Sequence, residues 1–506
     1  MSLPLWKKAS IALTILYLLP IWLLQYLPLN DLPNHLASVH LLIQHYQGKC
    51  DFIIPNGNLL VPNLSSFHFM VFIGQFIGAD AAARVLLSLY ALLLPASLAY
   101  FLKAIKPELE PYSLAAFAVM YNWFFLMGFL NFTISIPLFL FAFGFYLKTR
   151  NEKFDIANAI FIAIIGLLLY FTHLAAFGAF AIAMAALWLM GKREKPIMEA
   201  FALVPGILVF ASYLLLSPPS MDGSQIVYGS MVKKLSYLIG GFPNPALWLF
   251  FALLAITHYL MNYRKTELPE LSSTGGQLLF IGIIFLAASF FIPENLPNWQ
   301  FASPRALPFA FALAFPFLAS WAHNNSQFSK ELLAGFALFS VILLAASLVS
   351  LLPLSSDVGA IASLSSKMEQ GSYAFSFGSG FTDSNIMFTE PLLHSWGYWT
   401  MQKGIFSPYL FSYGYSPLSY SSRNLRGSDD IGRWMDELAY ETFTYAGNDT
   451  CKAWRNYHSK INWSMISQNY DYVVFRAGKC DGGVIVPGTY ALIANESGNL
   501  VYGKAN

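Results

Sequence analysis

Apolar residues follow one another in long runs through the first 353 residues of the chain, and polar residues interrupt them at short intervals. Eleven of these runs approach or exceed the length that crosses ~30 Å of hydrocarbon as a helix rising ~1.5 Å per residue. They cover residues 9–29, 81–104, 112–127, 131–148, 155–171, 174–190, 197–216, 244–262, 276–292, 305–322 and 331–353. The pattern predicts that residues 1–353 form a membrane domain, an all-α bundle of about 11 transmembrane helices.

The segment 62–78 is apolar enough to be a twelfth span, and the positive charges decide against it. If it lies on the membrane surface and the N-terminus is cytoplasmic, 13 of the 18 Lys and Arg residues in the first domain are cytoplasmic and 5 lie outside. If it spans the membrane, 6 are inside and 12 outside. Cytoplasmic loops carry an excess of Lys and Arg, so we expect an interfacial helix within an extracytoplasmic loop over residues 30–80.

Apolar content falls after Pro353, and 11 of the 29 Lys and Arg residues lie in this shorter part. Its pattern predicts helices at 357–369, 429–440 and 451–468 and strands at 373–377, 470–476, 490–494 and 500–502, the last two as a hairpin. Residues 354–506 are therefore expected to form a water-soluble α/β domain. An odd number of spans places it outside the cytoplasm, where Cys451 and Cys480 can form a disulfide, while Cys50 is expected to be free.

Composition agrees with a polytopic membrane protein, because 56% of the 506 residues are hydrophobic and only 11% are charged. A net charge of +2 excludes a strongly basic surface for nucleic acid. The first run is too long for the apolar core of a cleaved signal peptide, so we expect it to remain as the first span. The sequence contains no glycine-rich phosphate loop followed by Lys-Ser/Thr, no Gly-x-Ser-x-Gly turn and no paired-cysteine zinc pattern.

A carboxylate closes the first apolar run, in the stretch Pro28-Leu29-Asn30-Asp31-Leu32-Pro33-Asn34-His35. Pro33 permits a new helix to begin beside Asp31, so the acid is expected at a water–lipid boundary. It is either a polar helix end or a functional group, the usual role of charges at membrane depth. His35 follows by four residues, and the two side chains can act on a proton or hold a divalent cation, although two ligands leave the metal undetermined.

Other polar residues are expected at the same extracytoplasmic ends of the spans. His173 closes a tight turn as a cap or a ligand, and Glu294 precedes a late span. Arg305, in Pro304-Arg305-Ala306-Leu307-Pro308, and Arg84 begin spans in the same leaflet. Each arginine can either extend to lipid head groups or bind a phosphate through its bidentate guanidinium fork.

These features, in this order, resemble the GT-C class of glycosyltransferases, especially the bacterial branch of protein mannosyltransferases and the aminoarabinose transferase of lipid A. The resemblance rests on a first span that ends in an exposed aspartate, on Pro62-Asn63-Leu64 opening a surface helix that ends in Phe76-Ile77-Gly78, on residues 81–86 entering the second span, and on the run Pro304-Arg305 to Pro316. The class often has a second acid after the aspartate; here Asn30-Asp31-Leu32-Pro33-Asn34-His35 looks more like a bacterial subgroup without it.

The resemblance implies a bacterial inner-membrane enzyme that transfers a sugar from a polyprenyl-phosphate-linked donor to an envelope glycan, lipid or protein on the extracytoplasmic side. Asp31 would be the general base, and Arg305, then Arg84, would bind the donor phosphate. This chemistry fits the residues independently, because attack by a hydroxyl needs one base and a phosphate leaving group needs cationic stabilisation more than a proton. His35, His173 and Glu294 would orient the base or bind a divalent cation.

Two other functions stay open. A transporter or flippase of a lipid-linked or polar solute predicts charges near the bilayer midplane, broken helices and two related halves. The charges here lie mostly at the ends of the runs and no halves repeat, although Pro95, Pro137 and Pro205 interrupt spans. A non-catalytic membrane anchor for the C-terminal domain leaves Asp31 without a role.

Overall fold

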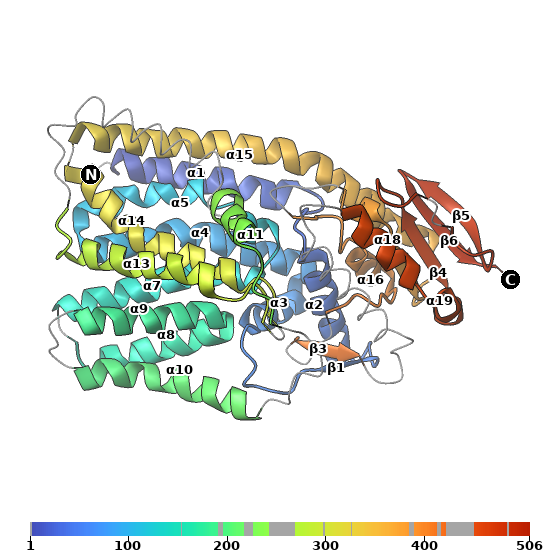
Figure 1. Cartoon of the computed structure of the whole chain (residues 1–506), viewed down its shortest axis with the longest axis horizontal. Coiled ribbons are helices and arrows are strands. Elements are labelled where there is room, and N and C mark those ends of the chain that lie inside the picture. Colours follow the sequence, from blue (N-terminus) through green and yellow to red (C-terminus); the bar gives the residue numbers. More distant parts are fainter. Residues whose placement is uncertain are drawn as a thin grey trace.

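The computed structural model describes residues 3–152, 154–190, 196–216, 226–241, 269–296, 299–324, 326–383, 389–411, 416–420, 450–482 and 485–505. Long helices run side by side in one bundle, and a smaller part that contains a β-sheet lies at one end of it (Figure 1). The bundle helices are α1 (Leu5–Leu23), α4 (Ala79–Ile105), α7 (Leu130–Glu152), α8 (Ile156–Thr172), α9 (Leu174–Met190), α10 (Pro196–Leu216), α13 (Thr274–Phe291), α14 (Leu307–Asn324) and α15 (Ser326–Ser363). We call the end that carries the sheet the tail end and residues 364–505 the tail.

Seven of the described helices are long and apolar enough to cross a membrane. α8 and α9 are apolar but have only 17 residues each. Of the other expected spans, 244–262 lies outside the described residues, and 112–127 is not one continuous helix. The helical membrane bundle is present, while the number of 11 helices is not reached among the described residues.

Residues 107–126 form a broken segment that returns from the end of α4 to the tail end. It consists of η1 (Pro107–Leu114), α5 (Ala115–Ala118) and α6 (Trp123–Leu126). Two polar side chains explain the break. The side chain of Asn122 caps α6 by accepting hydrogen bonds from the N–H groups of its first turn. The hydroxyl of Tyr90 donates a hydrogen bond to the carbonyl of Met120 (2.9 Å). Both remove backbone groups that a continuous helix would use.

Segment 62–78 forms α3 (Ser65–Ile77), which lies with α2 (Leu32–Tyr46) at the tail end. Its 13 residues reach only ~20 Å at ~1.5 Å per residue, too little to cross a bilayer. Gly78, with φ at +85°, turns the chain sharply from α3 into α4. The hydroxyl of Ser65 donates to that of Thr172 (2.9 Å), which ties the start of α3 to the end of α8. This arrangement agrees with an interfacial helix.

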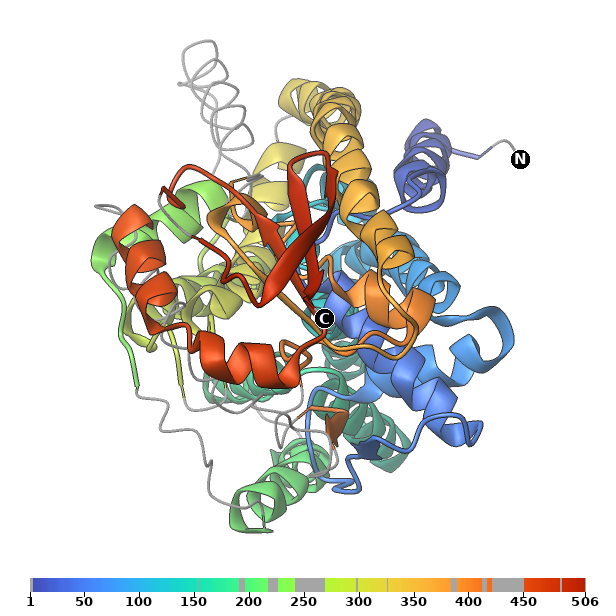
Figure 2. The same cartoon turned by 90° about the vertical axis from the view of Figure 1, so that its right-hand side faces the viewer.

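The tail contains a four-stranded sheet in the order β2-β4-β6-β5. β2 (Ala374–Phe377) pairs in parallel with β4 (Tyr472–Arg476), and β4 pairs antiparallel with β6 (Asn499–Lys504). β5 (Tyr490–Glu496) and β6 form the expected hairpin through residues 497–498, both with positive φ. Figure 2 looks onto this end of the molecule, where the sheet lies over the bundle. The four strands thus occur where the sequence predicts them.

The helices of the tail differ from those expected. α15 continues through Pro353 to Ser363, so it includes the first half of the helix expected at 357–369. The short 3₁₀ helix η4 (Leu364–Lys367) follows it directly. The expected helix 451–468 is two helices, α18 (Thr450–Lys460) and α19 (Trp463–Asn469), because Asn462 caps α19 by accepting from Met465 N (3.1 Å). The helix expected at 429–440 lies outside the described residues. Aromatic side chains of α18 and the sheet share a small core that includes Phe375, Phe377, Trp454, Tyr457 and Phe475.

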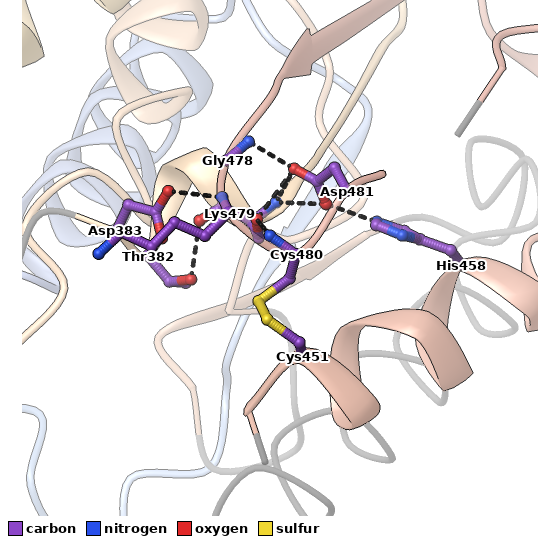
Figure 3. The surroundings of a disulfide bond; sticks show 9 residues. Thr382, Asp383, Cys451, His458, Gly478, Lys479, Cys480 and Asp481 are labelled. Carbon is purple, nitrogen blue, oxygen red and sulfur yellow. Dashed lines mark hydrogen bonds and ion pairs between the residues drawn. A yellow bond between two sulfur atoms is a disulfide. The ribbon is translucent and has the colours of Figure 1, made fainter. Parts of the chain in front are cut away.

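A disulfide joins Cys451 at the start of α18 to Cys480, which follows β4 (Figure 3). Cys50 is free and buried. We call residues 478–481 with Ser379 the disulfide turn. Its centre is Asp481, whose carboxylate accepts from Ser379 N (2.8 Å), Ser379 Oγ (3.0 Å) and Gly478 N (2.7 Å) and lies 3.3 Å from His458 Nε2.

Tail and bundle share one hydrophobic core, which includes Leu392, Trp396 and Trp399 of the tail. Several long-range contacts hold them together. β1 (Ile53–Pro55) pairs antiparallel with β3 (Leu418–Tyr420). The buried amide of Asn34, in α2, donates to the carbonyl of Tyr409 (2.9 Å) and accepts from Phe411 N (3.0 Å). The first turn of α2 is therefore fixed to the tail, and α16 (Gly397–Lys403) packs beside it.

Candidate active site

Asp31 lies in the connection between α1 and α2, where the bundle meets the tail. The backbone N–H groups of Asn30 and Asp31 donate to the carbonyls of Leu126 (2.9 Å) and Met127 (3.0 Å). This close approach requires Gly128, because its φ is +71° and a Cβ there would lie 3.1 Å from the N atom of Asp31. Backbone contacts with the end of α6 therefore fix the position of the aspartate.

The carboxylate of Asp31 is largely enclosed, with 13% of its side chain exposed. Asn30 Nδ2 donates to its Oδ1 (2.7 Å), and Nε2 of His394, from the tail, lies 3.6 Å from the same oxygen. Burial raises the pKa of Asp31 to about 7, although the hydrogen bond from Asn30 and the charge of Arg305 act in the opposite direction. A carboxyl with this pKa can take up and release a proton near neutral pH.

His35 was expected to act together with Asp31, but its ring packs against aromatic side chains. It lies edge-on to Phe67 and Phe411, with ring centroids 5.0 and 5.7 Å away, and is hydrogen-bonded to the backbone of Gly128. Burial lowers its pKa to about 4, so the ring is neutral at pH 7. Its Nδ1 is buried and has no hydrogen-bond partner among the described residues. The histidine that contacts the carboxylate is therefore His394.

Arg305 lies in η3 (Ser303–Ala306), at the start of α14, and is 8% exposed. Its guanidinium carbon lies 5.1 Å from the ring centroid of Phe129, 5.5 Å from that of Trp299 and 5.7 Å from that of Phe132. Within the described ranges its Nε and Nη1 atoms have no hydrogen-bond partner. Aromatic faces stabilise the cation but accept no conventional hydrogen bond, so the guanidinium is left with donors for an anion.

Arg305 and Asp31 are near enough to interact electrostatically. His173 belongs to the same group. Its ring centroid is 4.9 Å from that of Phe132 and 6.0 Å from that of Trp299, two of the rings that surround Arg305. The Nδ1 atom of His173 accepts from Ala175 N (3.2 Å), a contact typical of a helix cap.

Glu294 belongs to a second cluster, with Tyr237 and Lys233. It is buried, accepts from the hydroxyl of Tyr237 (2.6 Å) and forms an ion pair with Lys233 (3.3 Å). The ring of Tyr237 contacts that of Phe301, which in turn contacts Phe129 beside Arg305. Glu294 is thus already paired with a cation, Lys233.

Arg84 serves another purpose in the structure. Its Nε donates to Asp80 (2.6 Å), Nη1 to the carbonyls of Ile21 and Leu24, and Nη2 to that of Gln25 (2.9 Å). These acceptors are the orphan carbonyls at the end of α1, which such a side chain stabilises. All of its nitrogens are engaged, so Arg84 offers no free donor to a phosphate, and we assign it no such role.

Sequence reasoning missed two site residues, His394 and Glu390. The backbone N–H of Glu390 donates to Asn30 Oδ1 (2.7 Å), so Asn30 links this residue to Asp31. Burial raises the pKa of Glu390 to about 7. The only signal in the sequence is the spacing Glu390-Pro391-Leu392-Leu393-His394, two ionisable groups four residues apart in an apolar, aromatic stretch.

No group of three or more His, Cys, Asp or Glu side chains in the described ranges is arranged to hold a metal ion. Asp31 and His394 together offer two ligand atoms, Oδ1 and Nε2, which lie 3.6 Å apart. Mg²⁺ is commonly held by one or two carboxylates together with substrate phosphates. A divalent cation at this site would therefore need ligands from the substrate.

No protein-family model and no curated protein matches the sequence. Among solved structures, ArnT from Cupriavidus metallidurans bound to undecaprenyl phosphate is 11% identical with a TM-score of 0.45, over 98% of this chain and 97% of its own. The mycobacterial arabinofuranosyltransferase AftD is 14% identical with a TM-score of 0.48, over 100% of this chain and 42% of its own.

A third match, the Archaeoglobus fulgidus oligosaccharyltransferase in complex with Zn and sulfate, is 11% identical with a TM-score of 0.37, over 92% of this chain and 68% of its own. All three are GT-C glycosyltransferases, the class that the sequence resembles. Because seven of the described helices are long and apolar enough to cross a membrane, the chain is a multi-pass membrane protein. The role of each site residue has to be argued from its own surroundings.

Proposed function

We propose that this protein is a glycosyltransferase that moves a sugar from a polyprenyl-phosphate-linked donor to a hydroxyl of an envelope glycan, lipid or protein. Asp31 is the general base, and Arg305 binds the phosphate of the donor. The reaction takes place on the extracytoplasmic face of a bacterial inner membrane, with the tail on that face and the N-terminus in the cytoplasm.

One observation carries the proposal: a largely enclosed carboxylate lies within electrostatic reach of a buried arginine that has two unpaired nitrogens among the described residues. The pKa of Asp31 is raised to about 7 by burial, and the Nε and Nη1 atoms of Arg305 are unpaired among the described residues. Leaving a buried guanidinium unpaired is costly for folding. Binding of an anion removes that cost, and a phosphate on a lipid carrier is the anion available at the end of a membrane bundle.

The two groups divide the chemistry between them. Asp31 takes the proton of the acceptor hydroxyl while the acceptor oxygen forms its bond to the anomeric carbon. The bond from that carbon to the phosphate oxygen breaks, and its electron pair stays on the phosphate. The phosphate thereby gains negative charge, which Arg305 stabilises more strongly in the transition state than in the ground state.

The distribution of positive charge supports the orientation. Lys7, Lys103 and Lys148 lie near the ends of α1, α4 and α7 that face away from the tail. Lys233 and Lys234, at the tail end, are both engaged: one pairs with Glu294, and the other donates to carbonyls at the end of α13. An excess of cations at the far end favours placing that end in the cytoplasm.

The alternatives fit these observations less well. A transporter needs polar groups near the middle of the bundle, whereas Asp31, His394 and Glu390 lie at its tail end. A membrane anchor would give no reason to bury Asp31 and Arg305 with their partners incomplete. We therefore retain sugar transfer as the function that the geometry supports best.

The substitution Asp31→Asn tests the proposal, because it keeps the size and the hydrogen bond to Asn30 but removes the base. We expect transfer from synthetic polyprenyl-phosphate sugars to fall by at least ~10³-fold, with membrane insertion and folding retained. Asp51→Asn is the matched control, since Asp51 is exposed in the connection after α2, and its activity should stay at the wild-type level. Wild-type activity in Asp31→Asn would rule out this mechanism.

A further inference from the structure

The tail reaches the site through residues 389–411. Glu390 N donates to Asn30, and the buried amide of Asn34 holds the backbone at Tyr409 and Phe411. His394 lies between these two attachment points. Contact with Asp31 is thus made from a segment that is fixed to the Asp31 connection on both sides.

The described contacts of the Asp31 carboxylate all fall on one oxygen. Asn30 Nδ2 and His394 Nε2 lie 2.7 and 3.6 Å from Oδ1. The described residues place no hydrogen-bond donor on Oδ2, which is therefore the oxygen that can take a proton from a hydroxyl.

We infer that His394 is a positioning residue that holds Oδ1 of Asp31 and leaves Oδ2 to accept the proton, so that segment 389–411 of the tail is part of the active site. The inference rests on the proposed function, in which Asp31 is the base. During the transfer the proton moves from the acceptor oxygen to Oδ2, and His394 keeps its own proton on Nε2. The distance of 3.6 Å is longer than a hydrogen bond and is expected to shorten when the acceptor binds.

The surroundings of His394 favour this role. Its ring lies edge-on to Phe411 and Trp396, with centroids 5.1 and 6.3 Å away, and the backbone of Gly397 donates to its carbonyl (2.9 Å). Nδ1 is buried and has no partner in the described part of the chain. Burial, followed by the effect of His35, lowers the pKa of His394 to about 3, so the ring is neutral at pH 7.

A neutral donor suits a base. A permanently charged partner on Oδ1 would hold the carboxylate ionised and make it a weaker base, as a lysine or arginine does to an acid. A neutral imidazole fixes the orientation with a single N–H and changes the affinity for the proton much less. The other ionisable groups that act on this region are Arg305 from η3, His35 from α2 and Glu390 from the tail.

The test compares His394→Ala and His394→Gln with His458→Gln as a matched control. His458 is the other histidine of the tail with a nitrogen within 4 Å of an aspartate, and its partner is Asp481 of the disulfide turn (Figure 3). We expect His394→Ala to lower kcat by ~10–100-fold with little change in KM, as removal of an orienting partner does. His394→Gln, whose amide reproduces the Nε2 donor, should recover most of the rate, and His458→Gln should leave it unchanged.

A second readout needs no substrate. The protonated carboxyl of Asp31 is followed by difference infrared spectroscopy against pH, and the band is assigned by its absence in Asp31→Asn. Because Nε2 of His394 lies 3.6 Å from Oδ1 in the free protein, loss of the donor in His394→Ala should raise the midpoint by only roughly a few tenths of a pH unit, while His394→Gln and His458→Gln keep it at the wild-type value. Thermal unfolding of each variant in detergent shows whether the tail is still folded.

The outcomes separate the inference from the proposed function. An unchanged midpoint and unchanged kcat in folded His394→Ala, with Asp31→Asn inactive, would overturn only the role of His394. Activity in Asp31→Asn would overturn the proposed function itself. A change in KM alone would also count against the positioning role, because it would mean that His394 acts on binding.

Discussion

Asp31 and Asp481 are both enclosed carboxylates with a histidine nitrogen within 4 Å, and the two regions around them are built in opposite ways. In the disulfide turn, Asp481 accepts from two backbone N–H groups and a hydroxyl, and a disulfide closes the chain beside it. At the junction of bundle and tail, Asp31 has one normal hydrogen bond, from Asn30, and the more distant His394.

The difference separates structural from chemical use of the same side chains. Buried polar groups in folded proteins are nearly always hydrogen-bonded, so a group that is satisfied contributes to stability. Beside Asp481, one buried nitrogen, Nε2 of His458, has no hydrogen-bond partner in the described residues. The junction gathers four such atoms: Nδ1 of His35, Nδ1 of His394, and Nε and Nη1 of Arg305. Unsatisfied donors and acceptors of this kind are expected where a ligand completes the set.

The two arginines at the tail end repeat the contrast. Arg84 gives its donors to Asp80 and to carbonyls at the end of α1, whereas Arg305 lies among aromatic rings with unpaired nitrogens. Sequence position alone makes them equivalent, because both begin a span in the same leaflet. Hydrogen-bond partners distinguish them.

The largest expected effect comes from the same substitution at both arginines. Arg305→Met removes the proposed phosphate-binding cation. If that proposal holds, sugar transfer should fall by ~10²-fold, and binding of added undecaprenyl phosphate, measured by quenching of tryptophan fluorescence, should weaken. Thermal stability in detergent should stay equal or rise, because an unpaired buried charge is removed. Trp299, 5.5 Å from the guanidinium, is the expected reporter.

Arg84→Met should lower thermal stability and leave lipid-phosphate binding unchanged. It strands the carboxylate of Asp80 and the carbonyls at the end of α1, so the melting temperature should fall, while the folded fraction binds undecaprenyl phosphate as the wild type does. Equal loss of binding in the two variants would abolish the distinction between them and return Arg84 to the phosphate site.

A smaller effect is expected from pH. The pKa of Asp31 is raised to about 7, so the carboxylate is deprotonated, and active as a base, only above that pH. We expect kcat/KM to be constant above pH ~8 and to fall about tenfold per pH unit well below 7. Measurement in Glu390→Gln separates the two acids, since the pKa of Glu390 is also raised to about 7. A profile that is flat from pH 5 to 8 would show that neither acid titrates in the free enzyme.

Much of this architecture was predictable from local pattern. Apolar runs mark the bundle helices, and alternation marks the four strands. Asp31 and Arg305 stand at the ends of runs on the same face, and they lie within electrostatic reach of each other. The broken segment 107–126 was not predicted, because capping by Asn122 and the hydroxyl of Tyr90 act against an apolar run that otherwise favours a helix. The apolar composition of this segment thus predicts a continuous helix, although its polar side chains favour a break.

The tail's part in the site was beyond sequence reasoning. His394 contacts Asp31 across more than 360 positions of chain, and no pattern within either segment announces the pairing. For the same reason the role of Arg84 could not be read from its position, since its acceptors are carbonyls that become available only when α1 ends beside α4. The role of each of these side chains depends on its hydrogen-bond or ion-pair partners, and those partners come from segments that only the tertiary fold brings together.

The smallest effect on activity is expected from the disulfide turn, although its effect on stability is large. Replacing Cys451 and Cys480 together by serine opens a loop with a sequence separation of 29, which a chain-entropy argument values at about 3–4 kcal/mol. The tail should unfold at lower temperature, and the wild type should approach the same behaviour in reductant. The folded variant should retain kcat within about twofold, because Asp481 and its donors do not touch the Asp31 carboxylate. Loss of transfer at a temperature where the tail is folded would mean that the two regions are coupled, and the separation of structural from chemical aspartate would fail.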